Sequence, residues 1–440
     1  TDTFTVVLNA QPASDVVLTV TSSDTGEATV NSPLTFTAAN WNSAQTVTVT
    51  GVDDSIIDGT QTSTVTVSIV DGSSDDDFDS VPDRTVSVAT VDDDVAGFTI
   101  AQSGGSTSVA ETGTSDTFTV VLDAQPSSDV VFSITSGDTG EVTVTSALTF
   151  TSANWNTPQT VTVTGADDNI IDGTITSTIN VAINDGSSDN NFDPVNDQTV
   201  SATTTDNDTA SFTIAQSGGS TSVSESGGTD TFTVVLDAGP TSDVVFTITS
   251  SDTGEATVTS ALTFTSANWN TPQTVTVTGA DDNIIDGTIT STINVAVNDG
   301  SSDDNFDSVN DQTVSVTTTD NDVAGFTITQ SGGSTSVAET GTTDTFTVVL
   351  NAQPAENVVL SISSNDSGEA TTTSLLEFTN ANWNSAQTVT VTGVDDSLVD
   401  GTQTSTITIT VVDVISDSSF HSVNDQTVSV TTTDDDVAGF

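Results

Sequence analysis

The fold is decided by a short alternating stretch of sequence, Asp116-Thr117-Phe118-Thr119-Val120-Val121-Leu122. Phe118, Val120 and Leu122 would share one face of a β-strand, because successive side chains of a strand point to opposite sides. A fixed period marks an array of similar units, and a period longer than 100 residues is that of a whole domain. At steps of 114 residues the stretch recurs, beginning at Asp2, Asp230 and Asp344.

Short segments of the same kind continue through residues 98–211, with Gly, Asp, Asn or Pro at most of the breaks between them. Thr and Val dominate these segments and favour pleated strands, while helical periodicity is absent. We expect seven or eight strands in this stretch, which is typical of an immunoglobulin-like β-sandwich. The strand-like segments are residues 98–100, 107–109, 118–122, 130–134, 142–144, 148–150, 161–163, 179–183 and 199–202.

The predicted fold is therefore all-β, a tandem array of four immunoglobulin-like antiparallel β-sandwich domains that form an elongated rod. The expected domains are repeat 1 (1–97), repeat 2 (98–211), repeat 3 (212–325) and repeat 4 (326–440). Repeat 1 lacks the counterpart of residues 98–114, so we expect a vacant first-strand position in its sheet. No spacer rich in Gly, Ser or Pro separates the repeats, and short junctions restrict domain rotation.

Charge and composition exclude several functions. The chain carries 62 Asp plus Glu against one basic residue, Arg84, and its formal charge is −61. Such a chain would repel nucleic acid and anionic membranes, and it has no apolar run long enough to cross a membrane. There is no Cys, and the single His, His421, stands where other repeats have Asp. No set of nucleophile and base recurs, so we expect no enzyme.

Four acidic elements recur at fixed places in each repeat. In repeat 2 they are Glu111, Glu141, the Asp167-Asp168 pair with Asp172, and the segment 206–208. Adjacent carboxylates repel one another unless a cation lies between them, and Ca²⁺ takes six to eight oxygen ligands in adaptable geometry. The set therefore predicts calcium sites where several of these elements meet at one end of the sandwich. Solvated surface acidity is the alternative interpretation.

The predicted ligands share these motif positions in all four repeats. They are Glu27, Asp53, Asp54, Asp58, Asp92, Asp93, Asp94, Glu111, Glu141, Asp167, Asp168, Asp172, Asp206, Asp208, Glu225, Glu255, Asp281, Asp282, Asp286, Asp320, Asp322, Glu339, Glu369, Asp395, Asp396, Asp400, Asp434, Asp435 and Asp436.

The repeat resembles a Calx-beta domain, the calcium-binding sandwich of sodium–calcium exchangers and many bacterial surface proteins. The likeness lies in an early-strand Glu (Glu111), an Asp-Asp-x-x-x-Asp motif (167–172), and a closing acidic triplet that runs into Ala-Gly-Phe, as at 92–98 and 434–440. The resemblance implies calcium bound at the end of each domain, near its junction with the next. The family often has a further acid where this chain has Ile175, which implies fewer ions per junction.

Two other recurring features leave alternatives open. The acidic loop 71–79 recurs around Phe192, where it would hold a second ion or be a solvated loop that a buried Phe anchors. Trp155 also recurs in every repeat, and it would either stack on a sugar or plug the core. We favour the anchored loop and the core plug.

These features together predict a non-enzymatic, calcium-binding spacer of a bacterial surface adhesin or fibre, located outside the cell. Its partners would be calcium ions and the neighbouring repeats of the chain. The first alternative is a subunit of a self-assembling filament or surface layer that contacts other copies, including strand donation into repeat 1. A structure in which the edge of repeat 1 is open to solvent would remove the reason for strand donation. The second alternative is a carbohydrate-binding array.

Overall fold

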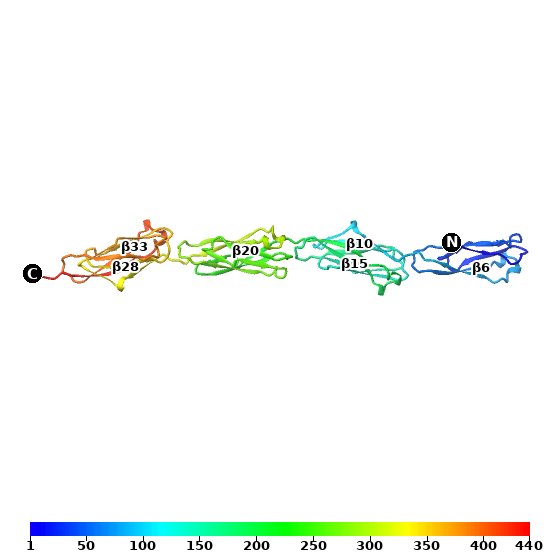
Figure 1. The fold of residues 1–440 in the computed structure, drawn as a ribbon, viewed down its shortest axis with the longest axis horizontal. Helices are drawn as coiled ribbons and strands as arrows, with labels where there is room; N and C mark the ends of the chain where they lie inside the picture. The colour runs from blue at the N-terminus through cyan, green and yellow to red at the C-terminus, as the bar shows by residue number, and fades with distance from the viewer. The chain divides into compact units, whose positions relative to one another are not determined.

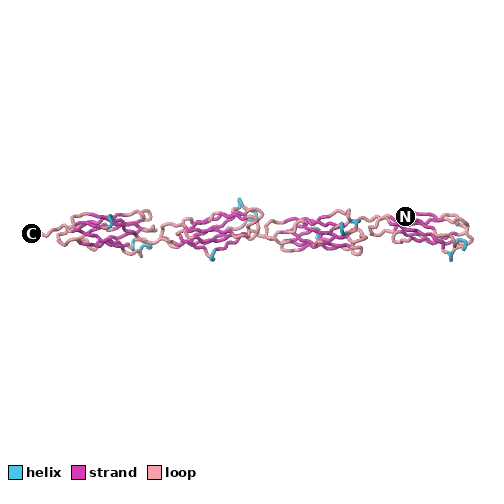
Figure 2. The backbone as a smooth tube through the Cα atoms, turned by 90° about the horizontal axis from the view of Figure 1, so that it is seen from below, coloured by secondary structure: helices cyan, strands magenta, loops and turns pink.

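The computed structural model describes all 440 residues of the chain. It is all-β, as predicted: strands joined by loops make up each repeat, and the helical pieces are single 3-10 turns (Figures 1 and 2). The chain divides into two compact units, Thr1–Asn207 and Asp208–Phe440. No helix in the structure has the length and apolar character needed to cross a membrane.

Repeat 2, in the first unit, consists of two sheets whose strand orders are β12-β14-β10-β8 and β13-β11-β15-β16-β9. Figure 1 labels one strand of each sheet, β10 and β15. The strands are β8 (Phe98–Gln102), β9 (Thr107–Ala110), β10 (Ser115–Leu122), β11 (Val130–Ser136), β12 (Val142–Val144), β13 (Ala147–Phe150), β14 (Gln159–Gly165), β15 (Ile175–Ile183) and β16 (Gln198–Thr205). The 3-10 turns are η3 (Ser103–Gly105), η4 (Asp185–Ser187) and η5 (Asn190–Phe192).

The strand count of seven or eight is wrong by at least one, because repeat 2 has nine strands. The two short pieces at its start belong to different sheets. β8 pairs with β10 in one sheet, and β9 pairs with β16 in the other. The turn at Gly104, where φ is 65°, carries the chain from one sheet to the other. Positive φ is accessible to Gly at little cost, so the turn residues fit this crossing.

The core of repeat 2 fills the space between its two sheets. Phe132 is fully buried, and its ring makes edge contacts with Phe98 and Phe150 at centroid distances of 4.9 and 5.7 Å. Such edge-to-face pairs stabilise a core beyond the burial of apolar area. Trp155 is partly buried and packs against this core, in agreement with the core plug.

Repeat 1 has the same arrangement without the strands that correspond to β8 and β9, and its sheets run β1-β5-β3 and β4-β2-β6-β7. β1 pairs only with β5, so its other edge is open. Phe4 is only partly buried there, while its counterpart Phe118 is fully buried. The elements are β1 (Asp2–Val6), β2 (Val16–Ser22), β3 (Ala28–Val30), β4 (Leu34–Phe36), β5 (Gln45–Gly51), β6 (Gln61–Ile69), η1 (Asp71–Ser73), η2 (Asp76–Phe78) and β7 (Arg84–Thr90).

In the second unit, repeat 3 has the sheets β17-β19-β23-β21 and β18-β25-β24-β20-β22. This is the strand order of repeat 2. Its elements are β17 (Phe212–Gln216), η6 (Ser217–Gly219), β18 (Thr221–Ser224), β19 (Thr229–Leu236), β20 (Val244–Ser250), β21 (Ala256–Val258), β22 (Ala261–Phe264), β23 (Gln273–Gly279), β24 (Ile289–Val297), η7 (Asp299–Ser301), η8 (Asp304–Phe306) and β25 (Gln312–Thr319).

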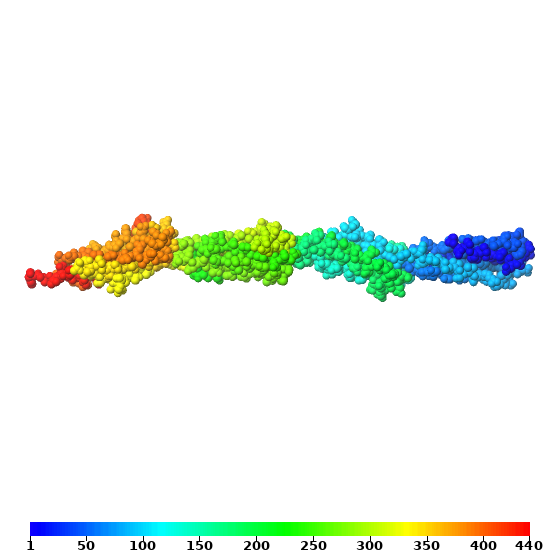
Figure 3. Space-filling view, viewed as in Figure 1, coloured from blue at the N-terminus to red at the C-terminus, as the bar shows by residue number.

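Repeat 4 has the sheets β26-β28-β32-β30 and β27-β34-β33-β29-β31. Residues after β34, red in Figure 3, extend away from the body of this repeat, and Val437 and Phe440 are exposed. The elements are β26 (Phe326–Gln330), η9 (Ser331–Gly333), β27 (Thr335–Ala338), β28 (Thr343–Leu350), β29 (Val358–Ser364), β30 (Ala370–Thr372), β31 (Leu375–Phe378), β32 (Gln387–Gly393), β33 (Gln403–Val411), η10 (Asp413–Ile415), η11 (Ser418–Phe420) and β34 (Gln426–Thr433).

Candidate metal centre

The acidic elements of repeat 2 meet at one end of the sandwich because of the way its strands pair. β14 ends at Gly165, which lies opposite Val142, the first residue of the antiparallel strand β12. Glu141 and the loop that carries Asp172 therefore leave their sheet at the same end. In the second sheet, Ile175 at the start of β15 lies opposite Thr204 near the end of β16, which brings the segment after β16 to this end as well.

Glu111 joins the group through the one parallel pair of the repeat. β9 runs parallel to β16, and Ala110 lies opposite Thr205. Parallel strands end at the same edge of a sheet, so Glu111 and Asp206, each one residue beyond its strand, become neighbours. The Glu111 N–H donates to the Thr205 carbonyl at 3.1 Å. Glu111 was expected within an early strand, and it lies instead directly after β9, at a strand end like the other acids.

A glycine allows this end of β9 to come close to the first sheet. A Cβ atom built on Gly165 would overlap the carbonyl oxygen of Ala110, the residue before Glu111. The Gly165 N–H donates to the Thr114 carbonyl at 3.0 Å. Repeat 1 has no counterpart of β9, and at Gly51, the equivalent glycine, the nearest atom to such a Cβ is a methyl carbon of Thr90 at 3.6 Å. Gly165 therefore lets Ala110, and with it Glu111, lie close to the first sheet.

Three carboxylates of repeat 2 converge: Glu111, Glu141 and Asp172 each place an oxygen within 4.8 Å of the others. Glu141 is only 5% exposed. Neither Oε2 of Glu141 nor Oδ1 of Asp172, both buried, has a hydrogen-bond donor. Burying a carboxylate without partners costs free energy, and proteins normally pair such groups or use them to bind metals.

The electrostatics of this cluster disfavour charge on its members. Burial raises the pKa of Glu141 to about 7, and the nearby charges of Asp172 and Glu111 act in the same direction. Burial also raises the pKa of Glu111, although a hydrogen bond from the Asn207 N–H at 3.1 Å opposes the rise. Burial raises the pKa of Asp172 as well, and the charge of Asp168 adds to the rise. A cation at this position would lower the pKa of all three carboxyl groups, because a nearby positive charge favours their ionised form.

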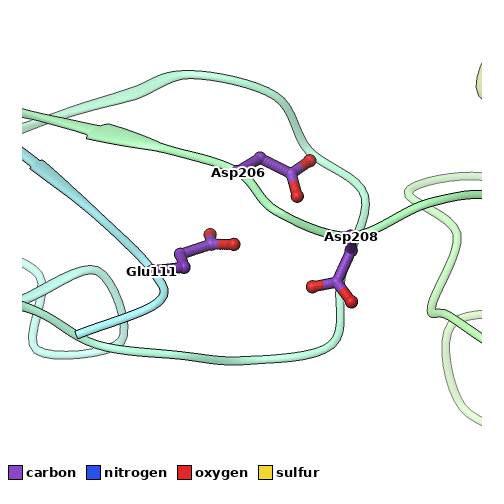
Figure 4. Close-up of side chains that lie close together, drawn as sticks. All are labelled: Glu111, Asp206 and Asp208. Carbon is purple, nitrogen blue, oxygen red and sulfur yellow. The ribbon is translucent and has the colours of Figure 1, made fainter. Parts of the chain in front are cut away.

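Asp206 organises the loop around the cluster. Its Oδ2 accepts hydrogen bonds from the N–H groups of Asp172 (3.1 Å) and Gly173 (2.9 Å). Figure 4 shows the Glu111 and Asp206 side chains extending from neighbouring chain segments, and it also labels Asp208, with which the second unit begins. Asp206 is therefore a candidate ligand that also holds in place the loop of a second candidate ligand, Asp172.

The second unit repeats the clusters. In repeat 3, oxygens of Glu225, Asp282 and Asp322 lie within 4.8 Å of one another, and so do those of Glu225, Glu255 and Asp286. Glu225 belongs to both groups. Burial raises its pKa to about 7, against a lowering by the Asn321 N–H. One carboxylate has two oxygens, so Glu225 can face two ions at once. In repeat 4 the group is Glu339, Asp396 and Asp436.

Other predicted ligands lie near these groups with different partners. The side-chain amide of Asn207 donates to Asp167 at 2.9 Å, and Asn321 does the same to Asp281. These asparagines stand where repeats 1 and 4 have the central Asp of the acidic triplet, and their side-chain amides pair with an acid across the site. Asp168 accepts from the Ile170 N–H within its own loop at 2.7 Å.

The remaining predicted ligands also lie at these ends. Asp320 and Asp434 accept from Gly287 and Gly401 as Asp206 does from Gly173, and the charge of Asp400 contributes to the raised pKa of Glu369, after burial. Asp395 and Asp435 line one pocket with Glu339. In repeat 1 all seven predicted ligands line a single small pocket: Glu27, Asp53, Asp54, Asp58, Asp92, Asp93 and Asp94.

The second acidic loop is built differently. Phe192 is fully buried, as the anchored-loop interpretation predicts, but Asp189 is also buried, at 3% exposed, and is not solvated. Its Oδ2 accepts from the N–H groups of Ser127 (2.7 Å) and Ser128 (2.9 Å) and from the Ser127 hydroxyl (2.7 Å). Its Oδ1 accepts from the Asn191 N–H at 3.0 Å. Every oxygen of this carboxylate has a donor, so the loop uses Asp189 as a clamp.

No family model matches the chain, and no curated protein matches it. Among solved structures, the chain is similar to domains 4–9 of the surface layer protein SbsC (16% identity, TM-score 0.22, 94% of this chain and 57% of that chain). It is also similar to the protocadherin GammaB4 extracellular domain (11%, 0.33, 94% and 60%) and to CBD12 from CALX1.2 (14%, 0.20, 45% and 79%). The chain thus spans less than two thirds of the length of the first two structures.

Proposed function

We propose that this chain is a non-enzymatic, calcium-binding array of extracellular β-sandwich repeats that serves as a rigid spacer of a bacterial surface adhesin or fibre. The observation that carries the calcium part is the set of buried carboxylate oxygens at one end of each complete repeat, close together and without donors. Glu141, Asp172, Glu255 and Glu369 each have such an oxygen.

Calcium fits this donor set better than other metals do. The clusters offer carboxylate oxygens, which hard cations prefer, while the chain has no Cys and only one His for softer metals. Ca²⁺ accepts irregular sets of six to eight oxygens, whereas Mg²⁺ demands near-ideal octahedral geometry. Three convergent acids, neighbouring carbonyls and water would complete such a shell. The shared position of Glu225 supports two ions per complete repeat.

Calcium would stabilise the folded repeat by linkage. An ion that binds only the folded state adds about 2.7 kcal/mol at a hundredfold excess over its dissociation constant. The same ion would neutralise repulsion among acids that hold neighbouring loops. The spacer part of the proposal rests on repetition, on the short junctions between repeats and on the lack of a recurring nucleophile–base set. Trp155 and Trp383 pack against their cores, so no observation favours a carbohydrate-binding array.

The test is a calcium titration of the whole chain by calorimetry, with melting curves in calcium, in magnesium and in excess EDTA. We expect calcium to raise the melting temperature and magnesium to do so less. Glu141→Gln keeps the shape of the side chain but removes its charge, and it should lower the number of ions bound while leaving the EDTA melt unharmed. Asp185→Asn, at an exposed acid outside the clusters, is the matched control.

Two results would contradict the calcium proposal: no calcium binding to the unaltered chain, or identical binding by the chain and its Glu141→Gln variant. Small-angle scattering under the same conditions tests the spacer separately. A stiff particle in calcium that becomes flexible in EDTA is the expected result, and an unchanged profile would reject the rigid-spacer role.

A further inference from the structure

Each acidic loop contains two adjacent apolar residues that calcium binding does not require. They lie between the Asp-Asp pair and the following Asp, and sequence reasoning did not assign them a role. The only sequence signal is their recurrence at the 114-residue step inside an otherwise polar loop. The pairs are Ile56-Ile57, Ile170-Ile171, Ile284-Ile285 and Leu398-Val399.

Within the first unit, the pair of repeat 1 is seated in repeat 2. Ile57 is 9% exposed and is part of the hydrophobic core cluster of repeat 2. Ile56 forms a parallel bridge with Gln125. The Gln125 N–H donates to the Ser55 carbonyl at 2.6 Å, and the Ile57 N–H donates to the Gln125 carbonyl at 3.1 Å. The loop of one repeat thus completes both the core and the backbone pairing of the next.

The side-chain amide of Asn191 adds a third hydrogen bond to this seat. It donates to the Ile57 carbonyl at 3.0 Å. Asn191 belongs to the loop that Asp189 clamps, and its own N–H donates to Asp189 Oδ1, so contacts within repeat 2 fix the position of this donor.

The second unit shows the same joint between repeats 3 and 4. Ile284 forms the parallel bridge with Gln353, whose N–H donates to the Asn283 carbonyl at 2.6 Å. The Ile285 N–H donates to the Gln353 carbonyl at 3.3 Å, and the Ile285 side chain packs against the core cluster of repeat 4. Two separately described joints therefore use one geometry.

The fourth loop has the same local form but an exposed pair. The Leu398 N–H donates to Asp396 Oδ1 at 2.7 Å, as the Ile56 N–H does to Asp54 at 2.8 Å. Leu398 is 63% exposed and Val399 is 57% exposed. Two adjacent apolar side chains held outward on an ordered, acidic loop are costly to solvate, and burial of their area on a partner would be favourable.

We propose that Leu398 and Val399 form a docking surface for a further sandwich repeat of this type, which receives Val399 in its core and pairs with the loop backbone. The joints between repeats 1 and 2 and between repeats 3 and 4 define this partner. It has a Gln-Pro loop whose Gln offers its backbone N–H and carbonyl, as Gln125 and Gln353 do, next to an accessible part of its hydrophobic core. Repeat 1 of a second copy fits less well, because it lacks the strand that begins with Phe98 in repeat 2. The proposal does not depend on calcium in the loop.

The test extends the chain in frame, with residues 99–211 appended after Phe440, and measures hydrogen exchange of the amides at 397–400 in calcium and in EDTA. The Val399 amide should exchange at least about tenfold more slowly in the extended chain, because it gains a carbonyl partner. Val399→Ser should abolish this protection, whereas Val414→Ser, at an exposed position elsewhere in repeat 4, should not. Unchanged exchange beside a cooperatively melting appended repeat would overturn the proposal.

A second measurement needs no extension. Ile57→Ser should lower the melting temperature of repeat 2 more than Ile56→Ser does, because only Ile57 lies in its core cluster. If Ile57→Ser left the melting temperature of repeat 2 unchanged, the apolar pair would not stabilise the joint, and this result would overturn the proposed docking surface. Protection that appears in EDTA as well as in calcium would separate this result from the fate of the calcium proposal.

Discussion

Glu141 and Asp189 are both buried acids of repeat 2, yet their surroundings are opposite. Asp189 has donors on both oxygens, from the backbone of Ser127, Ser128 and Asn191 and from one hydroxyl. Glu141 has a buried oxygen with no donor, and other carboxylates surround it. Burial alone would raise the pKa of Asp189, but these donors outweigh burial and hold the pKa below its usual range. The pKa of Glu141 rises to about 7.

The difference teaches how to separate a structural acid from a candidate metal ligand. Exposure does not distinguish the two residues, because both are nearly inaccessible. The donors do: a carboxylate that the fold itself satisfies is stable as an anion, and one that the fold leaves without donors needs a proton or a cation. A count of acids in the sequence mixes the two kinds.

The largest expected effect is that of Asp189→Ala. The change leaves the backbone N–H groups of Ser127, Ser128 and Asn191 without an acceptor, and each such loss costs about 1 kcal/mol where water can reach the donor. We expect the free energy of unfolding of repeat 2 to fall by about 2–4 kcal/mol in calcium and in EDTA alike. Denaturant unfolding measures it, with Asp185→Ala in the same loop as the control. A loss seen only in calcium would place Asp189 among the metal ligands and break the comparison.

The pH dependence of stability should separate the two acids next. The folded-state pKa of Glu141 and Glu225 lies above the usual 4.5, so their protonated forms stabilise the fold at low pH, and this contribution is lost as pH rises toward about 7. Asp189 and Asp303 have lowered pKa values, so their contribution is present above pH 3.8 and is lost as pH falls below it.

Melting curves in EDTA from pH 3 to 8 should therefore show greatest stability between these two windows. Saturating calcium should remove the fall between about pH 4.5 and 7, because the ion needs the deprotonated carboxylates. If stability in EDTA instead rose steadily through this range, the unsatisfied acids would not be the dominant titrating groups.

The smallest expected effect is that of Ser127→Ala. It removes the one hydroxyl that donates to Asp189 and leaves the three backbone donors. Repeats 1 and 4 already have Ala13 and Ala355 at this position. We expect a loss of about 1 kcal/mol or less by denaturant unfolding, with no change in calcium binding. A loss as large as that of Asp189→Ala would show that the hydroxyl, and not the backbone, holds the clamp.

The fold class could be predicted from the sequence because each strand alternates at period two and each break carries turn residues. The segment around Phe118 is one such strand, and the structure confirms it as β10. The crossing of the first two short strands between sheets could not be predicted. It depends on β9 pairing with β16, where Thr107 lies opposite Ala202, 95 residues further along the chain, and no local pattern encodes that choice.

The candidate site was only partly predictable for the same reason. Repetition identified the acidic elements, but which of them meet depends on strand pairing, and calcium binding by these residues stays a prediction. No local pattern predicts that the Asn207 amide pairs with Asp167, or that Asp189 accepts hydrogen bonds on both of its oxygens. The polar character of the loop also does not predict that Ile57 lies in the core of the following repeat.

The close approach at Gly165 has a consequence for how such a chain grows by duplication. The glycine and the carbonyl that it accommodates, that of Ala110, both lie within residues 98–211, and Gly279 and Ser224 form the same pair within 212–325. A duplication of a whole 114-residue module copies both halves of this contact together. A recombination breakpoint between β9 and β14 separates the two halves, so that β9 can meet a residue other than glycine at this position. Any side chain there would then obstruct the end of β9, directly before the glutamate.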